Sequence, residues 1–303
     1  MIKEARLSLI ERAAGRLDLQ ALGAGPIPFA PAVTKSVTEP TSFAETAGSP
    51  PHHELPSDGV GRSGVMEEPP RRPAKPLSVS FDRARLRELA LVDWAAGRTR
   101  AAEEFRIIKR QLLEQAADPE RCGPRCNLIM ITSVRPREGR TFTALNLAIS
   151  IAVERNWQVL LVDACDDENA VASVVQTASP LGWLDLVEDP TLEVASAVLE
   201  TDIPRLSLML PGRPQGRNAE PLASGNMQRL LEELSERNRN RVVLIDAPSC
   251  LDTSDPAMLA RVVGQTVLVV EAHATQQQGV EAALDLLRPC ENTYLVLNKS
   301  RTS

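Results

Sequence analysis

The sequence has 303 residues, of which 43% are hydrophobic and 24% charged, and its formal net charge is −6 at pH 7. This composition is typical of a folded protein with one sizeable domain and excludes a chain that is disordered throughout. The acidic balance argues against a general nucleic-acid binder, and no apolar run reaches the roughly 18 residues that a membrane helix needs.

Two segments of different composition precede the main domain. Residues 1–20 are predicted to form an amphipathic docking helix, because Leu7, Ile10 and Leu17 recur on one side at helical spacing. This stripe is too small to fold alone, so we expect it to dock onto its own domain, another subunit or a membrane protein. Residues 21–78 hold about half of the 23 prolines without any apolar period, which is typical of a disordered linker.

Residues 79–126 are predicted to form a helical segment that leads into the main domain. Phe105 and Leu112 belong to an apolar stripe, while Glu103 and Arg106 share a polar face. Such a face is either solvated or a contact between subunits, and the pattern leaves both interpretations open.

From residue 127 to residue 303, short apolar strands alternate with amphipathic helices. The expected strands are 127–133, 158–164, 206–211, 241–247, 265–272 and 293–299, and the expected helices are 141–156, 227–238, 255–263 and 278–287. Apolar strands without alternation, separated by helices, indicate a parallel sheet that is covered on both faces. The predicted fold class is therefore α/β, with a doubly wound, mainly parallel sheet.

The segment VRPREGRT at 134–141 lies between the first strand and the first helix of this domain. Main-chain N–H groups and the helix dipole converge on an anion in such a loop. Gly139 and Thr141 match the pattern G-x-x-x-x-G-K-[ST], whereas Val134 replaces its first glycine and Arg140 its lysine. The residues predicted to bind the phosphates of a cofactor are Pro136, Arg137, Glu138, Gly139, Arg140, Thr141 and Phe142.

Two aspartates stand at the ends of predicted strands. Asp163 follows the strand LLV and Asp246 follows the strand VLI, and the carboxyl ends of parallel strands border the crevice where such sheets bind ligands. Together with Thr141, these aspartates would suit Mg²⁺, which takes one or two carboxylates in addition to phosphate oxygens. Taken singly, each aspartate is equally compatible with a turn or a helix cap.

Several motifs occur in an order that resembles a known family. They are LSLIERAAGRL, AEEFRIIKRQLL, ITSVRPREGRTFTALNLAISIA, VLLVDA, GWLDLVED, AEPLASGNMQRLLEEL and LVLNKS. From about residue 80 to the C-terminus, the chain resembles the bacterial tyrosine kinases (BY-kinases) of polysaccharide export, most closely the exosortase-associated tyrosine autokinases. The resemblance implies the deviant P-loop fold of septum-positioning and plasmid-partition ATPases.

The resemblance also implies an activity and its cofactors. BY-kinases transfer a phosphoryl group from ATP, with Mg²⁺, to tyrosine. Arg140, Asp163 and Asp246 would then be the catalytic residues, with Arg140 and Thr141 on the phosphates and Asp163 as metal ligand or base. The implied metal ligands are Thr141, Asp163 and Asp246.

Partners and a location are implied as well. The family self-associates in rings through a Glu-Arg-rich helix, onto which Glu103, Arg106 and Lys109 map, so we expect a homo-oligomer. The usual partner is a membrane polysaccharide copolymerase that regulates chain length, and no nucleic acid is expected. Because the N-terminus lacks the apolar run of a signal peptide and the five cysteines are scattered, we expect a cytoplasmic protein, peripheral at the inner membrane through its partner.

The sequence departs from the family pattern at two places in the predicted site. Arg137 replaces a glycine that lets the main chain approach phosphate, and Arg140 replaces a compact ammonium with a planar guanidinium. Cys165 replaces the second carboxylate of an Asp-x-Asp motif, and the acidic residues 166–168 follow where the family has a basic patch. These departures predict impaired catalysis.

Lysine and tyrosine are scarce in the domain. No lysine occurs between Lys109 and Lys299, which predicts that no lysine of the domain serves the phosphates. The family's C-terminal tyrosine cluster has no counterpart, and Tyr294 is expected to be a core residue of a buried strand. Whether Asn298 and Lys299, which match the family's last strand, contact a purine stays open.

Three functions remain open. The first is BY-kinase-like phosphoryl transfer to tyrosines of another protein in exopolysaccharide biosynthesis or export, with weakened catalysis. The second is a pseudokinase that serves as a scaffold for the polysaccharide copolymerase. The third, a partition-type P-loop ATPase, ranks last because it needs a lysine near the start of its loop, and this loop has none.

Overall fold

The computed structural model describes residues 78–81, 83–89, 91, 99–123, 125–165, 171–175, 179, 181–212, 224–237 and 240–300. The chain divides into two units, Met1–Ala74 and Lys75–Ser303, and all described residues belong to the second unit. The predicted docking helix at 1–20 lies outside the described residues, as does the predicted linker at 21–78 except for its last residue.

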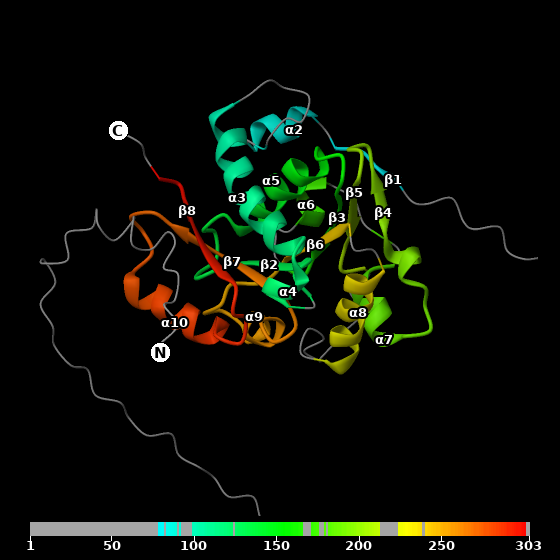
Figure 1. The fold of residues 1–303 in the computed structure, drawn as a ribbon. Helices are drawn as coiled ribbons and strands as arrows, with labels where there is room; N and C mark the ends of the chain where they lie inside the picture. The colour runs from blue at the N-terminus through cyan, green and yellow to red at the C-terminus, as the bar shows by residue number, and fades with distance from the viewer. Residues whose placement is uncertain are drawn as a thin grey trace, which may run out of the picture. The chain divides into compact units, whose positions relative to one another are not determined.

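Eight strands of the described part form one sheet (Figure 1). They are β1 (Ser78–Val79), β2 (Leu128–Ser133), β3 (Gln158–Asp163), β4 (Leu199–Thr201), β5 (Leu206–Met209), β6 (Arg241–Asp246), β7 (Gln265–Glu271) and β8 (Thr293–Asn298). Their order across the sheet is β1-β4-β5-β3-β6-β2-β7-β8, and every neighbouring pair is parallel except β4 and β5. The predicted parallel sheet is therefore confirmed, with one antiparallel pair near its edge.

Helices cover both faces of the sheet. They are α2 (Arg83–Glu88), α3 (Arg100–Ala116), α4 (Pro119–Cys122), α5 (Arg140–Ala152), α6 (Val171–Val175), α7 (Trp183–Glu188), α8 (Gly225–Glu236), α9 (Asp255–Leu259), α10 (Gln277–Leu287) and the 3₁₀-helix η1 (Val194–Ala197). In Figure 1, α2, α3, α5 and α6 lie on one side of the strands, and α7, α8, α9 and α10 lie on the other. This arrangement confirms the doubly wound fold class.

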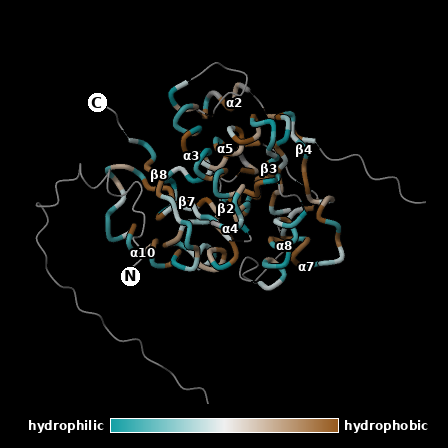
Figure 2. The backbone as a smooth tube through the Cα atoms, in the orientation of Figure 1, coloured by the Kyte–Doolittle hydropathy of each residue, from teal (hydrophilic) through white to brown (hydrophobic). Residues whose placement is uncertain are grey.

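Two apolar cores result from this layering. Leu128 and Met130 of β2 join the core beneath α7 to α10, while Ile129 and Ile131 join the core beneath α3 and α5. Successive strand residues point to opposite faces, so a strand between two helical layers must be apolar at every position. Hydrophobic and hydrophilic stretches alternate along the covering helices (Figure 2), as expected when each helix buries only one side.

Several element boundaries differ from the sequence prediction. The first helix of the domain ends at Ala152 rather than at residue 156, because residues 153–157 reverse the chain before β3 begins. The helix that starts at Asp255 is likewise shorter than predicted and ends at Leu259. Tyr294 lies in the predicted strand but is only partly buried, since β8 is the edge strand of the described sheet.

None of the helices in the described part of the chain combines the length and the apolar character that crossing a bilayer requires.

Candidate functional site

The carboxyl ends of the central strands meet at the loop that connects β2 to α5. This loop, residues 134–139, is called the phosphate loop below. Asp163 and Asp246 are direct register partners at the ends of the adjacent strands β3 and β6, as the sequence predicted from their positions. Both aspartates are fully buried, and Thr141 in the first turn of α5 is buried beside them.

The main chain of the phosphate loop is tightly constrained. Gly139 caps the N-terminus of α5 with φ 99°, and Arg137 has φ 67°. A Cβ atom on Gly139 would lie 2.0 Å from Nδ2 of Asn298, so both conformation and space require glycine there. Arg137, in contrast, holds a left-handed conformation that costs about 1 kcal/mol for a residue with a side chain.

Glu138 shapes the loop from inside. Its Oε2 accepts hydrogen bonds from the main-chain N–H groups of Val134 (2.8 Å) and Arg135 (3.0 Å), and its Oε1 accepts one from Thr275 (2.5 Å). Asn298 donates to the Glu138 carbonyl at 2.9 Å. The Glu138 carboxylate therefore has a structural role, because it occupies two loop amides that could have received an anion, while the contact of Glu138 with phosphates stays a prediction.

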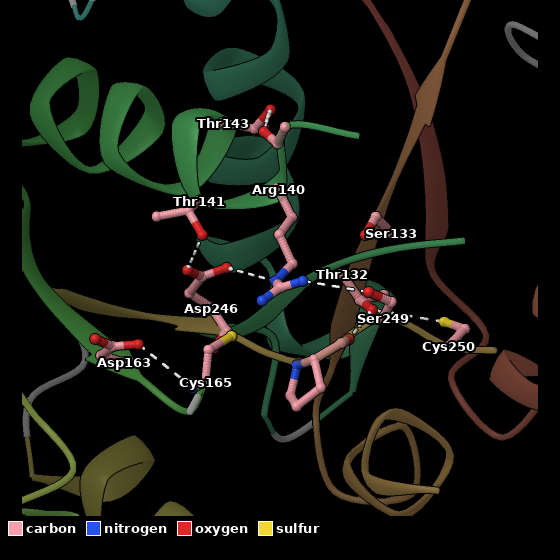
Figure 3. A network of polar contacts seen from close by, with 12 residues as sticks. Thr132, Ser133, Arg140, Thr141, Thr143, Asp163, Cys165, Asp246, Ser249 and Cys250 are labelled. Atoms are coloured by element: carbon pink, nitrogen blue, oxygen red, sulfur yellow. Dashed lines mark hydrogen bonds and ion pairs between the residues drawn. The ribbon is translucent and has the colours of Figure 1, made fainter. Parts of the chain in front are cut away.

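Arg140 and Thr141 both turn towards Asp246 (Figure 3). The Thr141 hydroxyl donates to Oδ2 of Asp246 at 2.7 Å, and the Arg140 guanidinium lies with Nε 3.7 Å from Oδ1. A second nitrogen of Arg140 donates to the hydroxyl of Ser249 at 3.2 Å. The side chain of Arg140 is only 7% exposed, so its charge is held within the site.

Asp163 contacts the main chain of Cys165 and of α6. Its two oxygens accept the main-chain N–H groups of Cys165 (3.3 Å) and Ala172 (2.8 Å), and its carbonyl accepts the indole N–H of Trp183 (2.8 Å). The carboxylate of Asp163 therefore acts in part as a turn residue, which was the alternative interpretation of its position in the sequence.

Cys165 completes a group of three possible metal ligands in the described part of the chain. The ligand atoms of Asp163, Cys165 and Asp246 lie within 4.8 Å of one another, and all three residues are buried. The Cys165 thiol donates to the Asp246 carbonyl at 3.2 Å. Burial raises the pKa of this thiol far above its ordinary value, and the charge of Asp246 adds to the rise, whereas Arg140 opposes it.

With Arg140 in its observed position, this site does not fit the Mg²⁺ that the sequence predicted. Mg²⁺ requires hard oxygen ligands in octahedral geometry, and a thiol is a soft donor. The oxygens of Asp163 are engaged by main-chain N–H groups, and Asp246 is contacted by the Thr141 hydroxyl and approached by the Arg140 guanidinium. A cation is thus already present where the metal was expected.

Two further residues are placed by contacts around the phosphate loop. Lys299 donates to the carbonyl of Arg137 (2.9 Å) and pairs with Glu271 (2.8 Å), so the domain does bring a lysine to the loop despite the lysine-free stretch before it. The ring of Phe142 packs edge-to-face against Phe105 of α3, with centroids 6.0 Å apart, and the predicted contact of Phe142 with the cofactor stays a prediction. Pro136 and Arg137 are exposed.

Sequence reasoning missed two residues of the site. Ser249 follows Asp246 in the turn after β6, and its position in the segment DAPS after a strand-end aspartate is the signal that could have indicated it. Thr275 lies in the turn before α10 and has no comparable signal, because only the fold brings it to Glu138.

The predicted self-association helix corresponds to α3. Glu103 and Arg106 are exposed and pair with each other at 2.9 Å. Lys109 is buried, and its ammonium donates to the Ser150 carbonyl (3.1 Å) and to Glu154 (2.6 Å), which ties α3 to α5. Of the three residues predicted for the subunit contact, Lys109 is therefore a buried structural residue.

Comparisons with known proteins find sequence similarity to tyrosine kinases. No family model matches the chain. The chain is 25% identical over 183 residues to the tyrosine-protein kinase CpsD of Streptococcus agalactiae, a match that covers 60% of this chain and 79% of that protein. It is 26% identical over 161 residues to the tyrosine-protein kinase Ptk of Acinetobacter johnsonii, covering 53% of this chain but only 21% of that longer protein.

Solved structures extend the similarity to the fold. The kinase domain of VpsO is 28% identical, with a TM-score of 0.51, and the match covers 64% of this chain and 98% of that domain. Sequence and fold together relate this chain to the bacterial tyrosine kinases.

Proposed function

We propose that this chain is a kinase-related, ATP-binding protein whose phosphoryl transfer to tyrosine is impaired. The similarity to tyrosine kinases and the strand-loop-helix geometry support an ATP site. One observation carries the impairment: the guanidinium of Arg140 lies against Asp246 and Ser249 inside the site. Phosphoryl transfer depends on cations that neutralise the developing charge, and a cation engaged in a buried pair is poorly placed for this task.

The predicted base is also poorly placed. Asp163 is fully buried, and both of its oxygens accept main-chain hydrogen bonds. A general base must come within hydrogen-bond reach of the proton that it removes, which here belongs to the hydroxyl of a tyrosine on another protein. This arrangement supports slow transfer, because a base that cannot reach the hydroxyl proton does not lower the activation free energy. Each 1.4 kcal/mol of activation free energy that is not removed slows the reaction about tenfold.

The proposal is tested by restoring the family residues. ATP binding to the full chain is measured by calorimetry, and phosphotyrosine formation is measured on a tyrosine-containing copolymer. We expect the double variant Arg140→Lys with Cys165→Asp to transfer phosphoryl groups at least about tenfold faster than the natural chain. Arg155→Lys makes the same arginine-to-lysine change at an exposed residue and should not alter the rate of phosphoryl transfer. A natural chain as fast as the double variant would contradict the proposal.

A pseudokinase scaffold is the second candidate function. Cys165 favours it, because this residue supplies a thiol where the family pattern has a second carboxylate. In this case even the double variant would show no transfer, although the chain would still bind its partner.

The proposed setting is exopolysaccharide biosynthesis or export, with a membrane polysaccharide copolymerase as partner and a cytoplasmic location at the inner membrane. It is supported by the sequence resemblance, including the segment LSLIERAAGRL at 7–17. Affinity capture of the tagged full chain from its own cells, followed by mass spectrometry, should recover the copolymerase. Recovery of partition or DNA-binding proteins in its place would contradict this setting.

A further inference from the structure

Asp246 is a fully buried carboxylate whose charge is balanced within the protein. Its exposed fraction is 0%, and Thr141 donates a hydrogen bond to one of its oxygens. A buried carboxylate without a nearby positive charge is strongly destabilising. The nearby positive charge is the Arg140 guanidinium, which reaches down from the first turn of α5 (Figure 3).

We propose that the Arg140 guanidinium takes the place of the divalent cation in this site, so that the chain binds nucleotide without requiring Mg²⁺. The nucleotide part of this proposal rests on the proposed function. The part that concerns the metal depends only on the residues around Asp246.

The chemistry of arginine suits this role. The guanidinium is charged at every physiological pH and carries five N–H donors in a planar group. Here one nitrogen faces Asp246 at 3.7 Å while another donates to Ser249 at 3.2 Å, so the cation is fixed in orientation as well as in position. A lysine has one compact ammonium and would not span both partners in the same way.

A metal would have to displace this guanidinium. The space between the strand ends is bordered by Asp163, Cys165 and Asp246, whose ligand atoms lie within 4.8 Å of one another. A divalent ion placed there would repel the nearby Arg140 charge, and it would find a thiol in place of a third hard ligand. The positive charge that a metal ion would bring to Asp246 is therefore supplied here by the protein, and no Mg²⁺ is needed to balance this carboxylate.

The metal part is tested without nucleotide, by thermal unfolding of the full chain with and without Mg²⁺ or Mn²⁺. Arg140→Met removes the charge beside Asp246, and Arg155→Met removes the same charge from an exposed residue that precedes β3. We expect the metal to raise the melting temperature of Arg140→Met by about 2–4 °C and to leave the other two proteins unchanged. An equal rise in the natural chain, or no rise in Arg140→Met, would overturn the proposal.

The nucleotide part is tested by calorimetry of ATP binding in EDTA and in excess Mg²⁺. We expect the two dissociation constants of the natural chain to agree within about threefold. Arg140→Lys is expected to bind ATP at least about tenfold more tightly with Mg²⁺ than in EDTA. Should Arg140→Met not fold, Arg140→Gln, which also removes the charge beside Asp246, replaces it in the thermal measurement.

The outcomes separate this inference from the proposed function. Binding by the natural chain that is about tenfold tighter with Mg²⁺ overturns the inference and leaves the proposed function intact. No ATP binding under either condition overturns the proposed function together with the nucleotide part, and the thermal measurement still decides the metal part.

Discussion

Gly139 has a conformation and a position that exclude a side chain. Its φ is 99°, and a Cβ atom would lie 2.0 Å from the amide nitrogen of Asn298, which itself holds the Glu138 carbonyl. Gly139→Ala must therefore strain the main chain and displace Asn298. We expect the free energy of unfolding to fall by about 1–3 kcal/mol, measured by urea denaturation.

Gly225 provides the matched control at the residue scale. It is the first residue of α8, and a Cβ atom there would meet nothing within 4 Å. Gly225→Ala should leave stability unchanged or raise it by up to about 1 kcal/mol, because alanine loses less entropy on folding. An equal loss in both variants would show that the phosphate loop imposes no special constraint.

Residue spacing predicted which side chains would meet, but not how they would be used. The positions of Thr141, Asp163 and Asp246 follow from the motif and from the ends of parallel strands. The direction of Arg140 does not, because it depends on Ser249, which lies 109 residues later in the chain. Lys299 illustrates the same limit, since only the last strand brings its ammonium to the loop.

Helix α3 presents an exposed apolar residue among ion pairs. Ile107 is 65% exposed, and the pairs Arg106–Glu103 and Arg110–Glu114 flank it. If copies of the chain associate through α3, this side chain becomes buried, which stabilises the contact by about 1.5–3 kcal/mol. We therefore expect Ile107→Glu to weaken self-association at least about tenfold, measured by sedimentation equilibrium.

Leu286 on α10 is the control for this helix. It is 40% exposed and lies on a helix that covers the other face of the sheet (Figure 1). Leu286→Glu introduces the same charge without touching α3, so self-association should persist. If Leu286→Glu dissociated the oligomer and Ile107→Glu did not, the prediction that copies of the chain associate through α3 would be wrong.

Periodicity predicted the buried stripe of α3, whereas the family resemblance placed Lys109 at a contact between subunits. Phe105 and Leu112 are buried as expected. Lys109 reads as a surface residue in a helical pattern, yet its ammonium reaches Ser150 and Glu154, which lie 41 and 45 residues later. The sequence of α3 alone does not predict these contacts, because they form only when α5 packs against this helix.

At the scale of the whole molecule, the sequence indicated the layers but not the order of the strands. Runs that are apolar at every position required helices on both faces, and this much is local information. The order places β2 between β6 and β7, which come much later in the chain. The short strand β1 pairs with β4, beside the antiparallel pair, and two residues are too few to produce a recognisable pattern.

The reactivity of the five cysteines should report on the unfolding of the whole domain. All five are free thiols, and Cys126, Cys165, Cys250 and Cys290 are buried, whereas Cys122 is partly exposed. Burial raises the pKa of Cys250 to about 11 and also raises the pKa values of the other four. At pH 8, a thiol with a pKa of about 11 is only about 0.1% thiolate, and the thiolate is the form that reacts.

We expect iodoacetamide to label the folded chain at least about a hundredfold more slowly than the chain in denaturant, followed by mass spectrometry. As long as the pH is below the pKa, the thiolate fraction rises about tenfold for each unit by which the pH increases. The labelling rate of the folded chain should therefore be about tenfold higher at pH 9 than at pH 8. Cys122 is partly exposed, but burial raises the pKa of its thiol as well, so it should also be labelled slowly in the folded chain. Rapid labelling of Cys250 at pH 8 would contradict this, because it would require the core beside the phosphate loop to open far more readily than the rest of the domain.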